Sequence, residues 1–246
     1  MPVTGARAPE FGGRPVVFVG PSLDLATAAR HLDAEFRPPV RRGDIDAILA
    51  GDRLPAALGI VDGVFFQEMS ISPKEVLRAV DRGITVFGSS SIGALRAVEC
   101  ACYGMVGIGR IYQAYRSGAI DADDEVAIVC DPETNAALSE PLVNMRFAVQ
   151  AALAAGAVTA GVAARFLEIA KELYFPQRSV RAVLRLLAAE LGEPECASLR
   201  RFLAERAPDT KRADAIALLA AIRSWSAPDP DPAPDPAARR DSRPDQ

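Results

Sequence analysis

Short apolar runs alternate with helical segments through the first half of the chain, and this alternation constrains the fold more than any other feature. Apolar strands are predicted near residues 15–19, 57–61, 84–87 and 125–130, with segments of helical spacing between them. Strands that alternate with helices in this way are typical of a parallel α/β sheet. We therefore expect an α/β fold with an N-terminal, largely parallel sheet and flanking helices.

The second half of the chain has the periodicity of helices throughout. From about residue 138 to residue 225, apolar residues recur at helical spacing, so an all-helical C-terminal region is expected to follow the sheet. The final segment is rich in Pro and Asp and cannot form a core. The predicted organisation is a flexible leader (1–14), an α/β core (15–131), a helical region packed on the core (132–225) and a disordered tail (226–246).

Composition excludes several classes of protein. The chain has one histidine, His31, which argues against a histidine-based metal site or a Ser-His-Asp triad. Its four cysteines lack the spacing of a zinc site or a disulfide framework. A net charge of -4 without a basic block disfavours a nucleic-acid partner. Residues 147–166 are too weakly apolar for a membrane span, and the N-terminal residues carry no apolar signal core. We expect a cytoplasmic protein that uses no metal and no membrane.

A serine-rich turn follows the strand predicted at 84–87. The sequence GSSSIGALRAVEC predicts a strand end, a small-residue turn and a helix, and this order places the turn at the carboxyl edge of the sheet, where ligands bind. Ser89, Ser91 and Gly93 occupy the alternate positions of a nucleophile elbow, with Ser89 in place of its first glycine. Ser91 is therefore a candidate nucleophile with helix amides beside it. The alternative is that the serine only caps the helix.

Lys74 is the candidate base for such a serine. Only three of the 28 basic residues are lysine, and Lys74 falls in the first turn of a helix that Ser72 and Glu75 should start with a capping box. Positive potential at a helix N-terminus and burial both lower the pKa of a lysine, whereas arginine cannot act as a base. The predicted Ser-Lys pair is Ser91 with Lys74. The alternative is that Lys74 is a solvated surface residue.

Other polar residues give weaker signals. Asp62 ends a predicted strand and either orients a site group or forms an ordinary Asp-Gly turn. Arg96 and Glu99 lie three residues apart on a helix, so they either serve the site or pair with each other. The turn GPSL, with Gly20 and Ser22, has one glycine of a phosphate-binding turn, which leaves an unrelated nucleotide-binding protein as a further possibility.

Several motifs of this chain occur together in the TfuA-like family, which the chain resembles. The motifs are VFVGPSL, PPVRRGD, GIVDGVF, SPKEVL, VFGSSSIGALRAVEC, GMVGIGRIYQAYRSG and DADDEVAI, in the order and spacing of the family. The similarity is dense from Val16 to about Asp131 and looser through PLVNMRFAV, LYFPQRSVRAVL and KRADAIALL. Ile92 stands where the family more often has methionine, an apolar exchange of similar volume.

The resemblance implies a role in peptide backbone thioamidation, within the biosynthesis of ribosomally made, modified peptides. Such a protein hydrolyses the C-terminal thiocarboxylate of a ThiS-like sulfur carrier and so delivers sulfide to a partner YcaO enzyme. It also helps the YcaO enzyme to bind its precursor peptide, and it needs no cofactor of its own. The alternative is a docking subunit without chemistry, which only assists the binding of peptide by YcaO.

The Ser-Lys pair of the family maps onto Ser91 and Lys74. In the mechanism that follows, neutral Lys74 takes the proton of Ser91, and Ser91 attacks the thiocarboxyl carbon. Amides near Ile92 and Gly93 would stabilise the resulting anion. The remaining candidates are Asp62 and Glu99 as supporting groups, and Gly20, Ser22, Ser89, Ser90 and Arg96 as residues that bind substrate.

Overall fold

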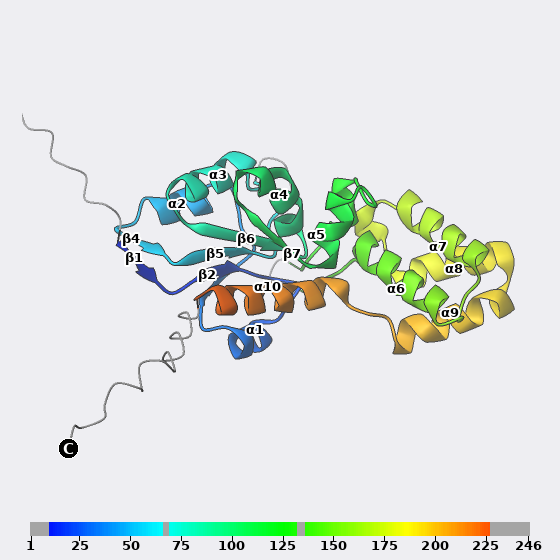
Figure 1. The fold of residues 1–246 in the computed structure, drawn as a ribbon. Coiled ribbons are helices and arrows are strands. Elements are labelled where there is room, and N and C mark those ends of the chain that lie inside the picture. The colour runs from blue at the N-terminus through cyan, green and yellow to red at the C-terminus, as the bar shows by residue number, and fades with distance from the viewer. Residues whose placement is uncertain (1–9, 66–68, 132–135, 227–246) are drawn as a thin grey trace, which may run out of the picture.

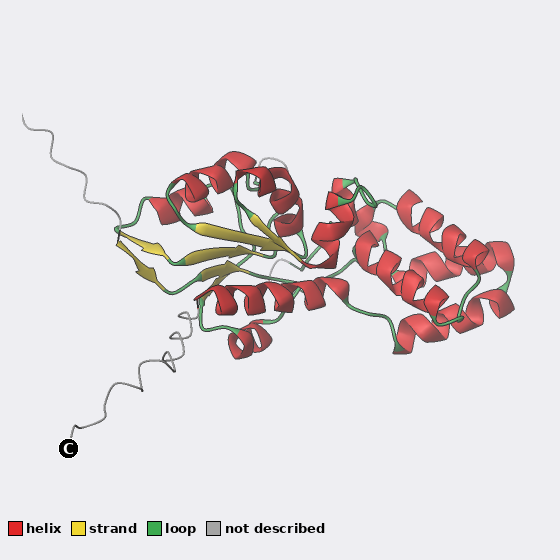
Figure 2. Ribbon diagram, viewed as in Figure 1, coloured by secondary structure: helices red, strands yellow, loops and turns green. Residues whose placement is uncertain are grey.

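The computed structural model describes residues 10–65, 69–131 and 136–226, and its N-terminal half is built on a parallel sheet (Figures 1 and 2). Five strands pair in parallel, in the order β3 (Glu35–Arg37), β2 (Val16–Phe18), β5 (Ala57–Ile60), β6 (Thr85–Ser89) and β7 (Val106–Ile108). Counted along the chain within this sheet, the order is 2-1-3-4-5, as in doubly wound folds. In such sheets ligands bind beyond the carboxyl ends of the strands where the order reverses, here β2 and β5.

Three of the four predicted strands are present, as β2, β5 and β6. The fourth, at 125–130, is wrong. The chain there forms a 3-10 turn, η2 (Asp123–Glu125), and then an irregular segment with an isolated bridge at Cys130. Val126 and Ala127 are buried, so the apolar run reflects packing of this segment against its neighbours and not pairing in the sheet.

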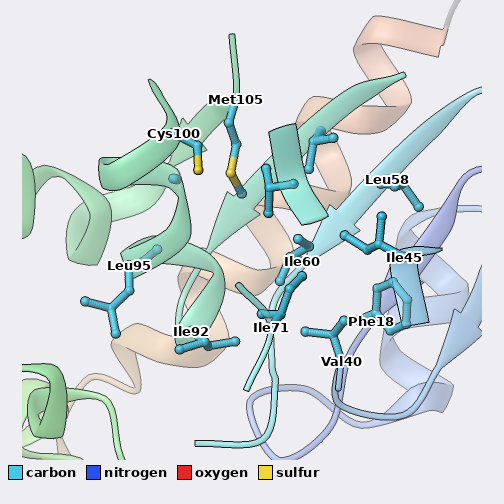
Figure 3. Packing of buried hydrophobic residues seen from close by; sticks show 14 of the residues in the cluster. Phe18, Val40, Ile45, Leu58, Ile60, Ile71, Ile92, Leu95, Cys100 and Met105 are labelled. Atoms are coloured by element: carbon cyan, nitrogen blue, oxygen red, sulfur yellow. The ribbon is translucent and has the colours of Figure 1, made fainter. Parts of the chain in front are cut away.

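Helices cover both faces of the sheet. The helices on one face are α2 (Asp44–Leu49), α3 (Pro73–Asp81), α4 (Ile92–Cys100) and α5 (Gly109–Arg116), and those on the other are α1 (Leu25–His31) and α10 (Thr210–Ser226) (Figure 1). Phe18 and Ile60 belong to the first core (Figure 3), and Val17 and Leu218 to the second. Successive residues of β2 thus enter different cores, because strand side chains alternate between the faces.

The helical part of the chain is divided between two places. A bundle beside the sheet has its own apolar core around Phe166 and contains α6 (Leu142–Ala154), α7 (Ala160–Glu172), α8 (Val180–Leu191) and α9 (Glu193–Glu205) (Figure 1). After α9 the chain returns to the sheet. The last helix, α10, packs there and buries Leu218 and Ile222. The structure therefore differs from the predicted single helical region at 132–225.

The Ala-rich segment at 147–166 is shared between α6 and α7 and is interrupted by a turn. Within the described residues, no helix combines the length and the apolarity that crossing a membrane would require.

The start of the described chain contributes a strand to a second, two-stranded sheet. β1 (Glu10–Gly13) pairs in parallel with β4 (Arg53–Pro55), so this part of the predicted leader is not flexible coil. Residues 1–9 and the predicted tail from residue 227 lie outside the described residues, and Ser226 is the last residue of α10.

Gly93 allows the start of α4 to lie directly against β5. A Cβ on Gly93 would lie 1.8 Å from the carbonyl oxygen of Ile60. Gly93→Ala should therefore lower the free energy of unfolding by about 1–3 kcal/mol through overpacking, as measured by urea unfolding. Gly161→Ala in α7 is the control, because a Cβ there meets open space, and it should be neutral or slightly stabilising. Equal stability of the two variants would contradict this role of Gly93.

Candidate functional site

The site is built on the turn between β6 and α4. The N–H group of Ser91 donates to the carbonyl of Ser89 at 2.8 Å, and the residue between them, Ser90, has a φ of 65°. This hydrogen bond across a residue with positive φ defines a rare, strained type of γ-turn. In the described part of the chain, Ser90 is the single non-glycine residue with positive φ. Backbone strain of this kind concentrates at functional sites.

The hydroxyl of Ser91 faces a buried lysine. Ser91 is the N-cap residue of α4, but its side chain makes no capping hydrogen bond. Its Oγ lies 3.1 Å from Nζ of Lys211, which also donates to the carbonyl of Val126 at 3.1 Å. The alternative reading of Ser91 as a simple helix cap is therefore wrong. A hydroxyl within hydrogen-bond distance of an amine is the arrangement of a nucleophile and its base.

Lys211 lies in an environment that favours a neutral amine. Its side chain is almost completely buried, and it is the second residue of α10. Burial lowers the pKa of Lys211 below its ordinary value of 10.5, while the negative charge of Asp62 acts in the opposite direction. The positive potential at the start of a helix also favours the neutral form. Lys211 thus has the surroundings that were predicted for Lys74.

The predicted pairing of Ser91 with Lys74 is corrected by the structure. Lys74 lies in the first turn of α3, and the predicted capping box is present, with the Ser72 amide donating to Glu75 Oε2 at 3.0 Å. Its side chain, however, is exposed, and the lysine that contacts Ser91 is Lys211. Both lysines occupy the first turn of a helix, so the signal that pointed to Lys74 was equally present at Lys211.

The other two serines of the turn hold α10 in place. Ser89 Oγ donates to the carbonyl of Asp214 at 2.9 Å, and Ser90 Oγ lies 2.9 Å from the carbonyl of Lys211. Both side chains are fully buried. The expectation that Ser89 and Ser90 bind substrate is therefore wrong, because their hydroxyls are engaged inside the protein. They position the helix that carries Lys211.

Asp62 joins the carboxyl ends of β2 and β5. Its Oδ2 accepts hydrogen bonds from the amides of Gly20 at 2.9 Å and Ser22 at 3.0 Å, and its Oδ1 accepts from the Ser22 hydroxyl at 2.6 Å. Ser22 Oγ lies in turn 3.1 Å from Ser90 Oγ. Asp62 thus orients the turn and provides negative charge near Lys211. Since the amides of Gly20 and Ser22 bind this carboxylate, they do not form a phosphate cradle or contact a substrate.

Ile92 supplies the amide best suited to an oxyanion. It is the first residue of α4, and the first N–H groups of a helix have no intrahelical acceptor. The amide of Gly93 instead faces the carbonyl of Val61 at 3.4 Å, which removes it from the predicted pair of oxyanion donors. Ile92 also lines the same pocket as Ser91.

Arg96 and Glu99 form an ion pair with each other on α4, which was the simpler of the two interpretations. The Glu99 side chain is 44% exposed, and its carboxylate is engaged by Arg96, so it does not support the Ser91–Lys211 pair as predicted. Arg96 lines a pocket next to that of Ser91.

Ser91 opens into a pocket with a volume of about 450 Å³. Its walls are mostly apolar and include Pro39, Phe65 and Phe175, while Ser91 and Asp62 supply polar groups. Pockets of this kind, with few polar groups on apolar walls, are typical ligand sites. Among the residues described, no group of three or more His, Cys, Asp or Glu side chains is arranged to hold a metal ion.

Two arginines hold the segment that carries the Val126 carbonyl. Arg178 is fully buried and donates to the carbonyl of Asp124 at 3.1 Å and to its carboxylate at 2.8 Å. Arg146 of α6 binds the buried carboxylate of Glu125 through both of its oxygens, at 2.6 and 2.8 Å. Both arginines belong to the helical part of the chain, which therefore fixes one of the two acceptors around Lys211.

A family model described as TfuA-like protein matches residues 62–179. This segment belongs to the TfuA-like family. The matched segment contains Asp62 and Ser91, whereas Ser22 and Lys211 lie outside it. A comparison with curated proteins found no match.

Lys211→Met should stabilise the protein near neutral pH, because methionine fills similar space without a charge to bury. Between the lowered pKa of Lys211 and 10.5, the unfolded chain binds more protons than the folded one, so wild-type stability rises with pH in this window. The gain in Tm from Lys211→Met should therefore shrink as the pH approaches 10.5. Thermal unfolding over this range measures it.

Lys171→Met is the matched control, because Lys171 is exposed in the last turn of α7. The change in Tm caused by Lys171→Met should stay constant over the same pH range. A Tm difference for Lys211→Met that stayed constant with pH would contradict the lowered pKa of Lys211.

Proposed function

We propose that this TfuA-like protein is a hydrolase in which Ser91 is the nucleophile and Lys211 is the base. Its substrate would be the C-terminal thiocarboxylate of a ThiS-like sulfur carrier, and a partner YcaO enzyme would use the released sulfide for peptide thioamidation. The observation that carries the hydrolase proposal is the 3.1 Å contact between Ser91 Oγ and the buried Nζ of Lys211. The carrier, the YcaO enzyme and help in binding its precursor peptide follow from the family resemblance.

The surroundings of Lys211 suit a neutral base. With one N–H group of Nζ directed at the Val126 carbonyl, the lone pair of the nitrogen is left to accept the proton of Ser91. Arginine could not replace it, because a guanidinium does not deprotonate in proteins. Pairs of serine and lysine are an established variant of nucleophilic catalysis.

The reaction proceeds in two steps that need no oxidant. In the first step, Ser91 Oγ bonds to the thiocarboxyl carbon while Lys211 takes the hydroxyl proton. The amide of Ile92 stabilises the tetrahedral oxyanion. The carbon–sulfur bond then breaks, and the sulfur takes up the proton from Lys211 and leaves as hydrosulfide. In the second step, water deprotonated by Lys211 attacks the acyl-serine, and Ser91 regains its proton. The carboxylic acid so formed passes its proton to hydrosulfide, and the net reaction therefore converts thiocarboxylate and water into carboxylate and hydrogen sulfide.

Two features separate this proposal from its alternatives. An exposed Lys74 by itself would favour the docking subunit without chemistry, but buried Lys211 beside Ser91 provides the base that hydrolysis requires. Nucleotide binding at the GPSL turn is disfavoured, because the amides of Gly20 and Ser22 are directed at Asp62.

Sulfide release from a thiocarboxylated carrier tests the pair directly. Ser91→Ala and Lys211→Arg should each lower the rate by about a hundredfold or more, since one removes the nucleophile and the other the base. The double variant should be little worse than either single one, because the two residues act as a unit. Lys74→Arg is the matched control and should retain activity within about twofold, since surface exchanges have small effects.

Circular dichroism of each variant establishes that loss of activity is not loss of fold. Wild-type-like sulfide release by Lys211→Arg would leave the docking subunit as the better account.

The pH dependence of sulfide release should report the ionisation of Lys211. Because only the neutral amine accepts a proton, the rate should rise with pH to a plateau. The midpoint of this rise should lie below pH 10.5. Asp62 raises the pKa of Lys211, so Asp62→Asn should move this midpoint to lower pH. Asp46→Asn, on an exposed residue that pairs with Arg78, is the control and should leave the midpoint in place. A midpoint that moved upward in Asp62→Asn would argue against Lys211 as the titrating group.

A further inference from the structure

A second pocket adjoins the pocket of Ser91. It has a volume of about 540 Å³ and lies between the start of α3 and α4. Phe65 and Ile92 line both pockets, so the two hollows share a wall. None of the steps proposed for Ser91 and Lys211 uses this second pocket.

Two residues that line this pocket each carry a buried hydrogen-bond donor without a partner in the part of the chain that the structure describes. Ser70 is 7% exposed, and its buried Oγ makes no hydrogen bond there. The buried Nε of Arg96 is likewise unpaired, although the other end of its guanidinium binds Glu99. Both residues line the pocket. Buried polar atoms without partners are rare in native proteins, and two of them on one cavity indicate a missing ligand with acceptor atoms.

The charged residues that line the pocket limit the chemical class of ligand that can bind there. The lining contains Arg42 and Arg96 together with Asp123 and Asp124, so it has both donors and acceptors and no strong excess of charge of one sign. A phosphate or another free anion would meet the carboxylate of exposed Asp123. A polypeptide main chain, which carries carbonyl acceptors and N–H donors at every residue, matches a lining of this kind.

We propose that this pocket is a subsite for the extended peptide segment that precedes the reacting acyl group. Main-chain carbonyls of that segment accept hydrogen bonds from Ser70 Oγ and Arg96 Nε, and the chain then passes Phe65 and Ile92 to bring its C-terminal carbonyl to Ser91. This inference rests on the proposed function in taking Ser91 as the reacting residue. It adds that the substrate is recognised through its main chain over several residues.

The test compares a single-residue thiocarboxylate with a pentapeptide thiocarboxylate, with kcat/KM for sulfide release as the readout. Wild type should prefer the longer substrate. Ser70→Ala and Arg96→Lys should each reduce this preference by about three- to tenfold, the effect of one lost hydrogen bond, since lysine keeps the charge of Arg96 but has no donor at Nε. Arg78→Lys on α3 is the matched control and should leave the preference unchanged, because Arg78 pairs with Asp46 away from the pocket.

Failure of the subsite and failure of the hydrolase proposal give different results. An unchanged preference in both variants, or a wild type that treats the two substrates alike, overturns the subsite. If wild type cleaves neither substrate, the hydrolase proposal fails, and the subsite is then decided by calorimetric binding of the pentapeptide carboxylate. Weaker binding to Ser70→Ala than to wild type supports the subsite in that case, and equal affinity overturns it.

Discussion

Hydrogen bonds between the β6–α4 turn and the first two turns of α10 join two distant parts of the chain at one place. The hydroxyls of Ser89 and Ser90 donate hydrogen bonds to carbonyls of α10, and the hydroxyl of Ser91 lies within hydrogen-bond distance of the Lys211 amine. The apolar face of α10, buried on the sheet through residues such as Leu218, keeps the helix in position. Burial of one such side chain contributes about 1.5–3 kcal/mol, so sheet packing stabilises a contact that is unfavourable by itself.

The site combines features that reduce stability. Ser90 has a strained backbone, and Lys211 loses most of its hydration. Asp62 compensates in part, because its carboxylate binds the β2 turn and places negative charge near the lysine. Features that weaken a fold at one place are retained when they serve function, and here they lie together where the β6–α4 turn contacts α10.

The helical bundle takes part in the site through the segment that follows η2. Arg146 and Arg178 bind Glu125 and Asp124, and the neighbouring carbonyl of Val126 accepts a hydrogen bond from Lys211. Buried ion pairs contribute little net stability compared with apolar packing, but they fix geometry. Through these bonds the helical part of the chain holds the segment whose carbonyl accepts a hydrogen bond from Lys211.

Local sequence determined most of the sheet, the helix start at Ser72 and the place of Ser91, because strand periodicity, capping and turn chemistry depend on residues that are close in the chain. It did not determine the strand β7 or the irregular segment after η2, because short apolar runs are compatible with more than one type of secondary structure. The partner of Ser91 was decided by tertiary structure alone. Lys74 and Lys211 share the same local signal, but Lys211, 120 residues from Ser91, is carried to it when α10 packs on the sheet, and burial then separates the two lysines chemically.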